Sequence, residues 1–384
     1  MSLAVDQAVE LTLWPHRLPG HPAAFAGRGT SGQLAALFEV LGTRRCLIVR
    51  GDTSYDRCGI ATAVDQALVG RDAHFVRAAP WQVTLTDLSA ALRTMAEFEP
   101  DTVLAIGGGS ALDLAKAMTN LAPAGPAELA VAVANGAVIE REIRLVLVPT
   151  TAGSGSELTR FATLWDGTRK LSLDAPGLRA DVALVDPDLV GSAPGPVLVS
   201  AATDALCQAI ESSWALASTP ESREWSEQAL RTMLPAIAIG IAQRSLRDPR
   251  LHEPLMLGAA LAGAAINTSR TTAAHALSYP VTAHLGIPHG AAVGVFVPWL
   301  LEHNRSVADV QRLQHISGEL AGEPLTSLIP RLLGLADYPV RPDQLALTDD
   351  ARRELFDMTE STRMQNNPRA VTRTDLIELL HPAS

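Results

Sequence analysis

Cysteine is scarce in this chain of 384 residues, which contains only Cys46, Cys58 and Cys207. Three cysteines cannot form an even disulfide framework, and their spacing matches no paired zinc-binding pattern. This usage is typical of a reducing compartment. The first twenty residues also lack the basic segment followed by an apolar segment that marks a signal peptide. We therefore expect a cytoplasmic protein.

Basic residues are outnumbered, and long hydrophobic runs are missing. The 31 Lys and Arg residues against 41 Asp and Glu residues give a formal net charge of -10. Nucleic-acid binding needs clustered cations in excess, so we expect no nucleic-acid partner. The most apolar helical stretch, residues 255–266, is too short to cross about 30 Å of hydrocarbon. We expect a packed core helix there and no association with a membrane.

Apolar strands and helical patterns alternate from residue 45 to about residue 190. The strands are expected around RCLIVRG, HFVRAAP, TVLAIGG, RLVLVPT and DVALVDP. Such alternation predicts a parallel sheet with helices on both faces. After a Pro/Gly/Ser stretch at 192–196 the strand signals end, and Ala- and Leu-rich helical patterns follow. The sequence therefore predicts an α/β N-terminal nucleotide-binding domain over residues 1–194 and an all-α C-terminal domain over residues 195–384.

Two small-residue turns follow neighbouring predicted strands. Glycines permit close backbone approach, and the N-terminus of a helix attracts phosphate. The first turn does not match the six-residue dinucleotide fingerprint, so a turn without a ligand remains an alternative. Two adjacent strand ends of this kind favour a nucleotide crevice. The candidate cofactor residues of these turns and of the segments after them are Gly107, Gly108, Gly109, Ser110 and Asp113, then Thr150, Thr151, Ser154 and Lys170, the last of which is otherwise a solvated surface lysine.

Cofactor preference is expected to depend on an earlier strand end. NAD-selective sites place a carboxylate at the end of the second strand, where it repels a 2′-phosphate. Here the strand ends at Gly51, Asp52 comes one residue late, and Ser54 follows. We count Gly51 and Ser54 among the cofactor residues and expect NADPH to be accepted at least as well as NADH.

Two histidines flank the segment HALSYPVTAHLGIPH. His275 is expected to close an Ala-rich helical run, and His289 follows a Gly-Ile-Pro sequence that breaks the helix. His284 between them is expected on a loop surface. Such a pair suits a divalent metal at a helix-to-loop junction, although unrelated structural histidines are the alternative. Asp204 is the best candidate for a third ligand.

Five ordered segments resemble the iron-dependent (group III) alcohol dehydrogenase family. They are GGGSALDLAK, PTTAGSGSELTRFA, DVALVDPDL, TDALCQAIES and HALSYPVTAHLGIPHG, and the likeness covers about residues 45–304. The resemblance implies an α/β nucleotide domain joined to a helical domain, an architecture shared with dehydroquinate synthases. It also implies a divalent metal, NADH or NADPH, and a dehydrogenase acting on an alcohol/aldehyde pair.

The family pattern also implies which residues bind the metal. Asp204, His275 and His289 match its ligands, and Gln208 replaces a histidine. A Gln carbonyl oxygen can ligate Fe²⁺ or Zn²⁺, though more weakly than imidazole. The alternative is a metal-free relative in which these groups bind the substrate directly. Tyr279 stands where many relatives have a proton-relaying histidine, and its reference pKa near 10 makes it a poorer base.

The segment before His275 indicates the substrate. Arg270, Thr271 and Thr272 place a cation and two hydroxyls where alcohol-oxidising relatives usually have apolar side chains. Arg270 and Thr272 are expected to bind an anionic tail, with Tyr279 beside the reacting carbonyl. An arginine paired to a structural carboxylate is the alternative. Within the family, the segment and Gln208 look most like the phosphonoacetaldehyde reductases, which form 2-hydroxyethylphosphonate.

Several other functions remain open. The substrate could be another short anionic or neutral aldehyde, or a maleylacetate-like compound. A dehydroquinate synthase-like lyase would need more Lys and Arg around the site than the sequence places there. Gln208 and Tyr279 are also compatible with a degenerate, non-catalytic nucleotide-binding protein. The sequence leaves a homodimer open.

Overall fold

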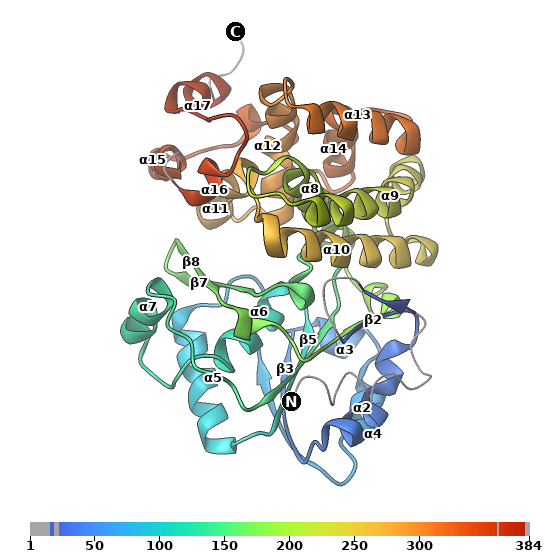
Figure 1. Ribbon diagram of the computed structural model, residues 1–384, viewed down its shortest axis with the longest axis vertical. Helices are drawn as coiled ribbons and strands as arrows, with labels where there is room; N and C mark the ends of the chain where they lie inside the picture. The colour runs from blue at the N-terminus through green and yellow to red at the C-terminus, as the bar shows by residue number, and fades with distance from the viewer. Residues whose placement is uncertain (1–15, 19–22, 359–360, 381–384) are drawn as a thin grey trace. The chain divides into compact units, whose positions relative to one another are not determined.

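The computed structural model describes residues 16–18, 23–358 and 361–380, and the chain divides into two compact units (Figure 1). The first unit comprises Met1–Thr151 and Gly155–Ala193, and the second comprises Ala152–Ser154 and Pro194–Ser384. The first is α/β, and the described part of the second is helical.

A seven-stranded sheet forms the centre of the first unit, in the order β1-β2-β9-β6-β5-β3-β4. All neighbouring strands are parallel except β1 and β2. The strands are β1 (His16–Arg17), β2 (Ala24–Ala26), β3 (Arg45–Arg50), β4 (Asp72–Arg77), β5 (Thr102–Gly107), β6 (Arg144–Pro149) and β9 (Val182–Val185). The expected parallel sheet is confirmed for the five predicted strands, which are β3, β4, β5, β6 and β9.

Both faces of this sheet are covered, because successive strand residues point to opposite sides. Leu47 and Val49 of β3 pack into one apolar cluster with α5, α6 and α7, while Cys46 and Ile48 pack into another with α2 and α4. Burial on both sides explains why these strands are continuous apolar runs. The helices are α2 (Leu34–Leu41), α3 (Ser54–Arg57), α4 (Ala61–Ala67), α5 (Leu85–Phe98), α6 (Gly109–Met118) and α7 (Pro126–Ala134).

Two features of this unit were missed by the sequence patterns. Strands β1 and β2 precede the first strand that we predicted. An antiparallel hairpin, β7 (Phe161–Asp166) with β8 (Arg169–Asp174), follows β6. Its Asp166-Gly167 corner, with Gly167 at a φ of 58°, lies between alternating apolar residues. That dipeptide is a hairpin signal and could have identified the pair.

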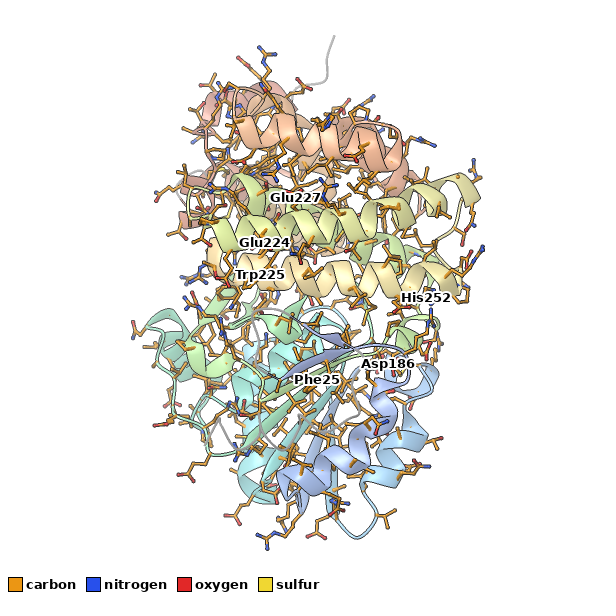
Figure 2. The ribbon with its side chains drawn as sticks, turned by 45° about the vertical axis from the view of Figure 1, so that its right-hand side comes forward. Phe25, Asp186, Glu224, Trp225, Glu227 and His252 are labelled. Atoms are coloured by element: carbon orange, nitrogen blue, oxygen red, sulfur yellow. The ribbon has the colours of Figure 1, made fainter. Side chains whose placement is uncertain are left out.

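Asp186 ends β9 and fastens it to the segment after β2 (Figure 2). Its carboxylate accepts hydrogen bonds from the backbone N–H groups of Gly29 and Ser31, both at 3.0 Å, and from the Ser31 hydroxyl at 2.6 Å. The predicted Asp186-Pro187 strand end is confirmed. The same carboxylate accepts a hydrogen bond from the Asp188 N–H at 3.0 Å, so both of its buried oxygens are hydrogen-bonded.

In its described part, the second unit contains helices and connecting loops but no strand. The helices are α8 (Gly195–Trp214), α9 (Pro220–Gln243), α10 (Pro249–Ser269), α11 (Ala273–Leu285), α12 (His289–His303), α13 (Ala308–Ala321), α14 (Leu325–Gly334), α15 (Asp349–Asp357), α16 (Thr362–Gln365) and α17 (Arg373–Leu380). Residues 255–266 lie within α10 and are mostly buried, as predicted. Within the described residues, no helix combines the length and the apolarity needed to cross a bilayer.

The predicted continuous run up to His275 is wrong. α10 ends at Ser269, and α11 begins at Ala273, so His275 lies in the first turn of a new helix. The break falls at Arg270, whose φ of 64° lies in the left-handed region. A non-glycine residue in that conformation ends the helix and turns the chain.

Candidate functional site

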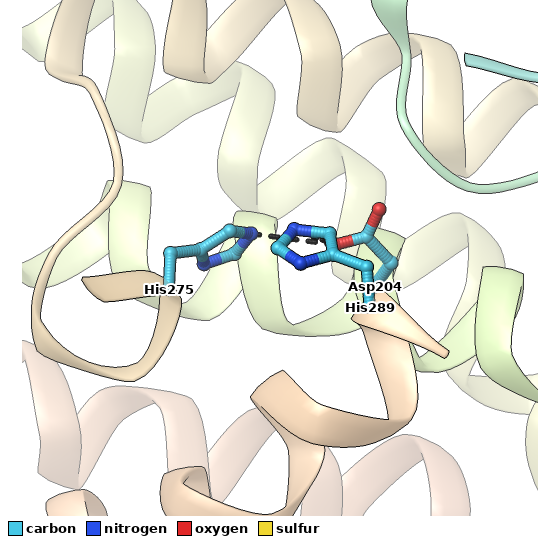
Figure 3. A group of neighbouring side chains, drawn as sticks. All are labelled: Asp204, His275 and His289. Carbon is cyan, nitrogen blue, oxygen red and sulfur yellow. Dashed lines mark ion pairs between the residues drawn. The ribbon is translucent and has the colours of Figure 1, made fainter. Parts of the chain in front are cut away.

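Asp204, His275 and His289 come together from α8, α11 and α12 (Figure 3). The Asp204 Oδ1 atom lies 3.3 Å from the His275 Nε2 atom and 3.9 Å from the His289 Nε2 atom. One ligand atom from each of the three residues lies within 4.8 Å of the others. This spacing suits a single cation placed between them.

The polar atoms that face this point fit a divalent metal. Asp204 Oδ1, Gln208 Oε1 and His275 Nε2 are buried and lack a hydrogen-bond partner among the described residues. Buried polar atoms without a partner are costly, and metal coordination would satisfy all three. Carboxylate and amide oxygens together with imidazole nitrogens suit Fe²⁺ or Zn²⁺. Gln208, one helical turn after Asp204, supplies the amide oxygen.

The cluster is buried on one side and open on the other. The exposed fraction of the side chain is 9% for Asp204 and 4% for His275, but 39% for His289. The Ser278 hydroxyl lies 3.3 Å from the His289 Nδ1 atom, which leaves His289 Nε2 directed at Asp204. Access to the cluster is therefore on the His289 side.

Glu211 holds His275 in place and was not identified from the sequence. Its carboxylate contacts His275 Nδ1 and accepts hydrogen bonds from the Thr272 hydroxyl at 2.6 Å and the Ala274 N–H at 2.8 Å. A carboxylate on one imidazole nitrogen directs the other nitrogen toward a metal. Glu211 lies seven residues after Asp204 on α8, on the same helix face, and this spacing was the signal that could have identified it.

Thr272 belongs to the same network. Its hydroxyl donates to Glu211 and accepts a hydrogen bond from Trp214 Nε1 at 3.0 Å, and the residue is fully buried. Both capacities of the hydroxyl are therefore engaged inside the protein. This geometry assigns Thr272 to orienting Glu211, which differs from the substrate contact expected from the sequence.

Both carboxylates of the cluster are poised to be ionised at neutral pH. Burial by itself would raise the pKa of Asp204, but the nearby imidazoles of His275 and His289 bring it below its ordinary value. Burial likewise opposes ionisation of Glu211, and the charge of His275 lowers the pKa of that carboxyl in the same way. Two ionised carboxylates stabilise a cation between the histidines.

Tyr279 and the chain segment before His275 border the cluster. The Tyr279 ring stacks on the His289 ring, with centroids 5.7 Å apart and an angle of 4° between the planes. Burial raises the pKa of Tyr279, and Arg363 opposes this shift with its guanidinium carbon 5.8 Å from the ring centroid. Tyr279 therefore presents an O–H donor at neutral pH. Arg363 also donates to the Thr271 hydroxyl.

His284 does not lie on a loop, so that expectation is wrong. It occupies the last turn of α11, and its Nε2 atom lies 3.0 Å from a Glu354 carboxylate oxygen. The helix persists to Leu285 and ends at Gly286, whose φ of 66° is the left-handed conformation of a helix end.

In the first unit, the strand ends at Gly51 and Gly107, both predicted to bind the cofactor, lie side by side. The Gly51 N–H donates to the Ile106 carbonyl at 2.8 Å, and a side chain at Gly107 would lie 3.2 Å from the Gly51 nitrogen. β3 and β5 are neighbours from which the chain proceeds to opposite sides of the sheet, the position where such sheets bind ligands. Gly108 starts α6 without a side-chain cap, so N–H groups of Gly109 and Ser110 remain for a phosphate.

The remaining cofactor candidates fall in different surroundings. Ser54 lies beside Gly51, and Thr151 lies beside Gly108. Thr150 is buried at the end of β6. The Asp113 carboxylate instead accepts hydrogen bonds from the Ser156 hydroxyl and the Thr163 N–H, which ties α6 to β7. Lys170 lies on β8, and Ser154 falls in the second unit.

Family comparisons cover nearly the whole chain. Residues 22–187 match the family described as iron-containing alcohol dehydrogenase, and residues 198–384 match the C-terminal part of the Fe-containing alcohol dehydrogenase family. The chain is 36% identical over 323 residues to a phosphonoacetaldehyde reductase of Streptomyces viridochromogenes, covering 77% of this chain and 80% of the relative. It is 27% identical over 305 residues to a sulfoacetaldehyde reductase of Bilophila wadsworthia, covering 74% and 76%.

Solved structures share the fold. A sulfoacetaldehyde reductase from Bifidobacterium kashiwanohense in complex with NAD+ has a TM-score of 0.82 at 24% identity, covering 97% of this chain and all of that one. An iron-containing alcohol dehydrogenase has a TM-score of 0.80 at the same identity and similar coverage. The chain therefore belongs to the iron-containing alcohol dehydrogenase family, and it is an alcohol dehydrogenase or aldehyde reductase.

Proposed function

We propose that this enzyme reduces phosphonoacetaldehyde to 2-hydroxyethylphosphonate with NADPH or NADH. The observation that carries the proposal is the Asp204–His275–His289 cluster, which is open at His289 and bordered by the segment from Arg270 to Thr272. The similarity to a phosphonoacetaldehyde reductase over most of both chains supports the same substrate class. A sulfoacetaldehyde reductase is a more distant relative, and its substrate is also an anionic aldehyde.

The residues in and around the cluster have three proposed roles: metal binding, orientation of a ligand and hydrogen bonding to the substrate. Asp204, Gln208, His275 and His289 would hold a divalent metal, which would act as a Lewis acid on the carbonyl oxygen of an aldehyde, while the nicotinamide would supply hydride. Glu211 fixes the His275 ring through its Nδ1 atom. Tyr279 donates a hydrogen bond to the substrate oxygen from its protonated hydroxyl, because its raised pKa makes it a donor and not a base.

Arg270 is proposed to bind the anionic end of the substrate. It follows α10 and precedes the helix that carries His275, and its φ of 64° is unfavourable for a residue with a side chain. Such a conformation costs about 1 to 3 kcal/mol and often occurs at binding sites. A planar guanidinium offers paired donors to a phosphonate.

Substrate specificity of the purified enzyme and of Arg270→Ala tests this function. The wild-type kcat/KM for phosphonoacetaldehyde should exceed that for propanal by about tenfold or more, since one charge-assisted contact contributes about 1.5 to 3 kcal/mol. Arg270→Ala should remove most of that preference and leave propanal reduction nearly unchanged. Equal losses on both substrates would make Arg270 a structural residue. Faster turnover of sulfoacetaldehyde, a maleylacetate-like compound or a neutral aldehyde would reassign the substrate.

For the cofactor we propose that NADPH is used at least as well as NADH. The Asp52 carboxylate, which would repel a 2′-phosphate, pairs with Arg77 at 3.0 Å. Arg77 thus offsets that charge and brings a cation to the end of β4. The kcat/KM values for the two cofactors at a saturating aldehyde concentration measure the preference. A hundredfold advantage for NADH would contradict the proposal and make Asp52 the discriminating residue.

A further inference from the structure

Arg363 lies on α16, far along the chain from the metal cluster, and the fold places it beside Thr271 and Tyr279. Asn366, three residues after Arg363, donates hydrogen bonds through its side-chain amide to the carbonyl oxygens of Ser269 at 2.9 Å and Thr271 at 3.1 Å. The Asn366 carbonyl also accepts a hydrogen bond from the Leu216 N–H at 3.0 Å, just beyond the end of α8. The end of α16 is therefore fastened to the segment before His275 and to the segment that follows α8.

The guanidinium of Arg363 contacts two residues near the cluster, Thr271 and Tyr279. It donates to the Thr271 hydroxyl, and its central carbon lies 5.8 Å from the Tyr279 ring centroid. The Tyr279 ring stacks in turn on His289, the most exposed of the three clustered residues. The Tyr279 ring thus contacts both the positively charged guanidinium of Arg363 and the ring of His289, the most exposed residue of the cluster.

This charge is not neutralised by its described neighbours. The contacts of Arg363 within the described residues are with a hydroxyl and an aromatic ring, both uncharged. A guanidinium has five N–H donors, and the bond to Thr271 uses only one. The remaining donors and the charge are therefore available to an anion. Thr271 also links Arg363 to Arg270, the preceding residue in the chain.

We propose that Arg363 is a specificity-determining residue, a second cation that binds the charged end of the aldehyde together with Arg270. This inference rests on the proposed function and deepens it. A phosphonate resembles a phosphate group, which carries a charge of about -1.5 to -2 near neutral pH, whereas a sulfonate carries a single charge. Two guanidinium groups match the phosphonate better than one does, so Arg363 selects phosphonoacetaldehyde over sulfoacetaldehyde.

The test compares Arg363→Gln and Arg363→Lys with the wild-type enzyme on phosphonoacetaldehyde, sulfoacetaldehyde and propanal. Arg363→Gln should lower kcat/KM for phosphonoacetaldehyde by about 10- to 100-fold, mainly through KM, and lower that for sulfoacetaldehyde less. Propanal reduction should stay within about twofold of the wild-type value. Arg363→Lys retains the charge and should recover part of the loss. Arg353→Gln, on an exposed residue of α15, is the matched control and should change none of the three rates.

A second measurement is independent of turnover. Isothermal titration of the holoenzyme with 2-hydroxyethylphosphonate should give a dissociation constant about 10- to 100-fold higher for Arg363→Gln than for the wild type. If Arg363→Gln does not fold, Arg363→Lys provides the test. A role for the charge alone predicts nearly wild-type binding of the phosphonate. A role for the paired N–H donors predicts weaker binding of the phosphonate, with the reduction of propanal unchanged.

The outcomes separate this inference from the proposed function. A wild-type enzyme with no preference for anionic aldehydes would overturn the proposed function and the inference with it. A wild-type preference for phosphonoacetaldehyde that survives in Arg363→Gln would overturn the inference alone. Equal losses on all three substrates would show that Arg363 supports the fold around Tyr279 and does not select the substrate.

Discussion

His275 is held from both sides of its ring. Its Nδ1 atom contacts the Glu211 carboxylate, and its Nε2 atom lies 3.3 Å from Asp204. Burial lowers the pKa of His275, but the two carboxylates more than compensate and raise it above its ordinary value. The side chain therefore has a fixed orientation before any metal binds, which reduces the cost of ordering it on binding.

Replacing Glu211 by Gln should weaken metal binding without unfolding the protein. Gln keeps the size of the side chain but removes the charge that orients His275 Nδ1, and such changes typically cost about 10- to 100-fold in metal affinity. Competition with a chelator of known affinity measures the effect. His284→Gln, which alters a histidine paired with Glu354 and outside the cluster, is the control. If Glu211→Gln binds the metal as tightly as the wild type does, Glu211 does not orient His275 for metal binding.

Gln208→His should leave metal affinity unchanged or raise it. The Gln208 Oε1 atom is buried without a hydrogen-bond partner among the described residues, and imidazole is the better ligand for Fe²⁺ or Zn²⁺. Metal content of protein purified without chelators measures the outcome, with Asp204→Ala as the metal-depleted reference. A clear loss of metal in Gln208→His would mean that Gln208 has a different function.

At the scale of helices, the metal ligands depend on close packing of α12 against α8. A side chain at Gly290 would place its Cβ atom 2.0 Å from the Ser200 carbonyl oxygen and 2.7 Å from the Asp204 Cβ atom. Gly290 directly follows His289, so the small residue sets the distance between two ligand-bearing helices. Backbone atoms cannot move aside as a flexible side chain can, and the contact is therefore intolerant of a methyl group.

Gly290→Ala should lower both stability and metal affinity. Overpacking of this kind costs about 1 to 3 kcal/mol and would push His289 away from Asp204. Thermal unfolding and chelator competition measure the two effects. Gly318→Ala on α13 is the matched control, because a Cβ there meets nothing within 4 Å, and it should be neutral or stabilising by up to about 1 kcal/mol. Equal behaviour of the two variants would contradict the packing argument.

At the scale of the whole molecule, each unit buries its own set of charges. The first unit buries Lys116, whose ammonium donates to the Ser156 hydroxyl at 2.7 Å, the Thr159 hydroxyl at 3.0 Å and the Phe161 carbonyl at 2.9 Å. Glu157 is buried nearby. Burial lowers the pKa of Lys116 to about 8 and raises the pKa of Glu157 to about 7. The stability of this unit should therefore depend on pH.

Glu157→Gln should flatten the decline in stability between about pH 4.5 and 7. The folded protein holds the Glu157 proton more tightly than the unfolded chain does, so the wild-type free energy of unfolding falls as pH rises through this window. Above pH 7 the wild type should be the less stable of the two by about 1 to 3 kcal/mol. Urea unfolding at several pH values measures the difference. Parallel curves for the two proteins would contradict a raised pKa of Glu157.

Local patterns determined much of the fold. β3, β5 and β6 are continuous apolar runs, because both of their faces are buried, and each ends within one residue of the predicted end. The Asp204 and Gln208 pair could be predicted because residues four apart share a helix face. The Thr372 hydroxyl accepts a hydrogen bond from the Asp375 N–H at the start of α17, a capping contact between residues three apart in the chain. In each case the information lies within one element.

Only the tertiary structure decided the features that depend on contacts between distant segments. The break between α10 and α11 occurs within a run of residues compatible with a helix, so no local pattern marked it. Glu211 gains its role from His275, 64 residues later, and Arg363 gains its place from Thr271, 92 residues earlier. Hydrogen bonds and charge contacts between such residues have no periodicity in the sequence. The sequence by itself therefore determined the domain types and the candidate ligands, whereas the folded chain decided which side chains orient those ligands and which cations stand beside them.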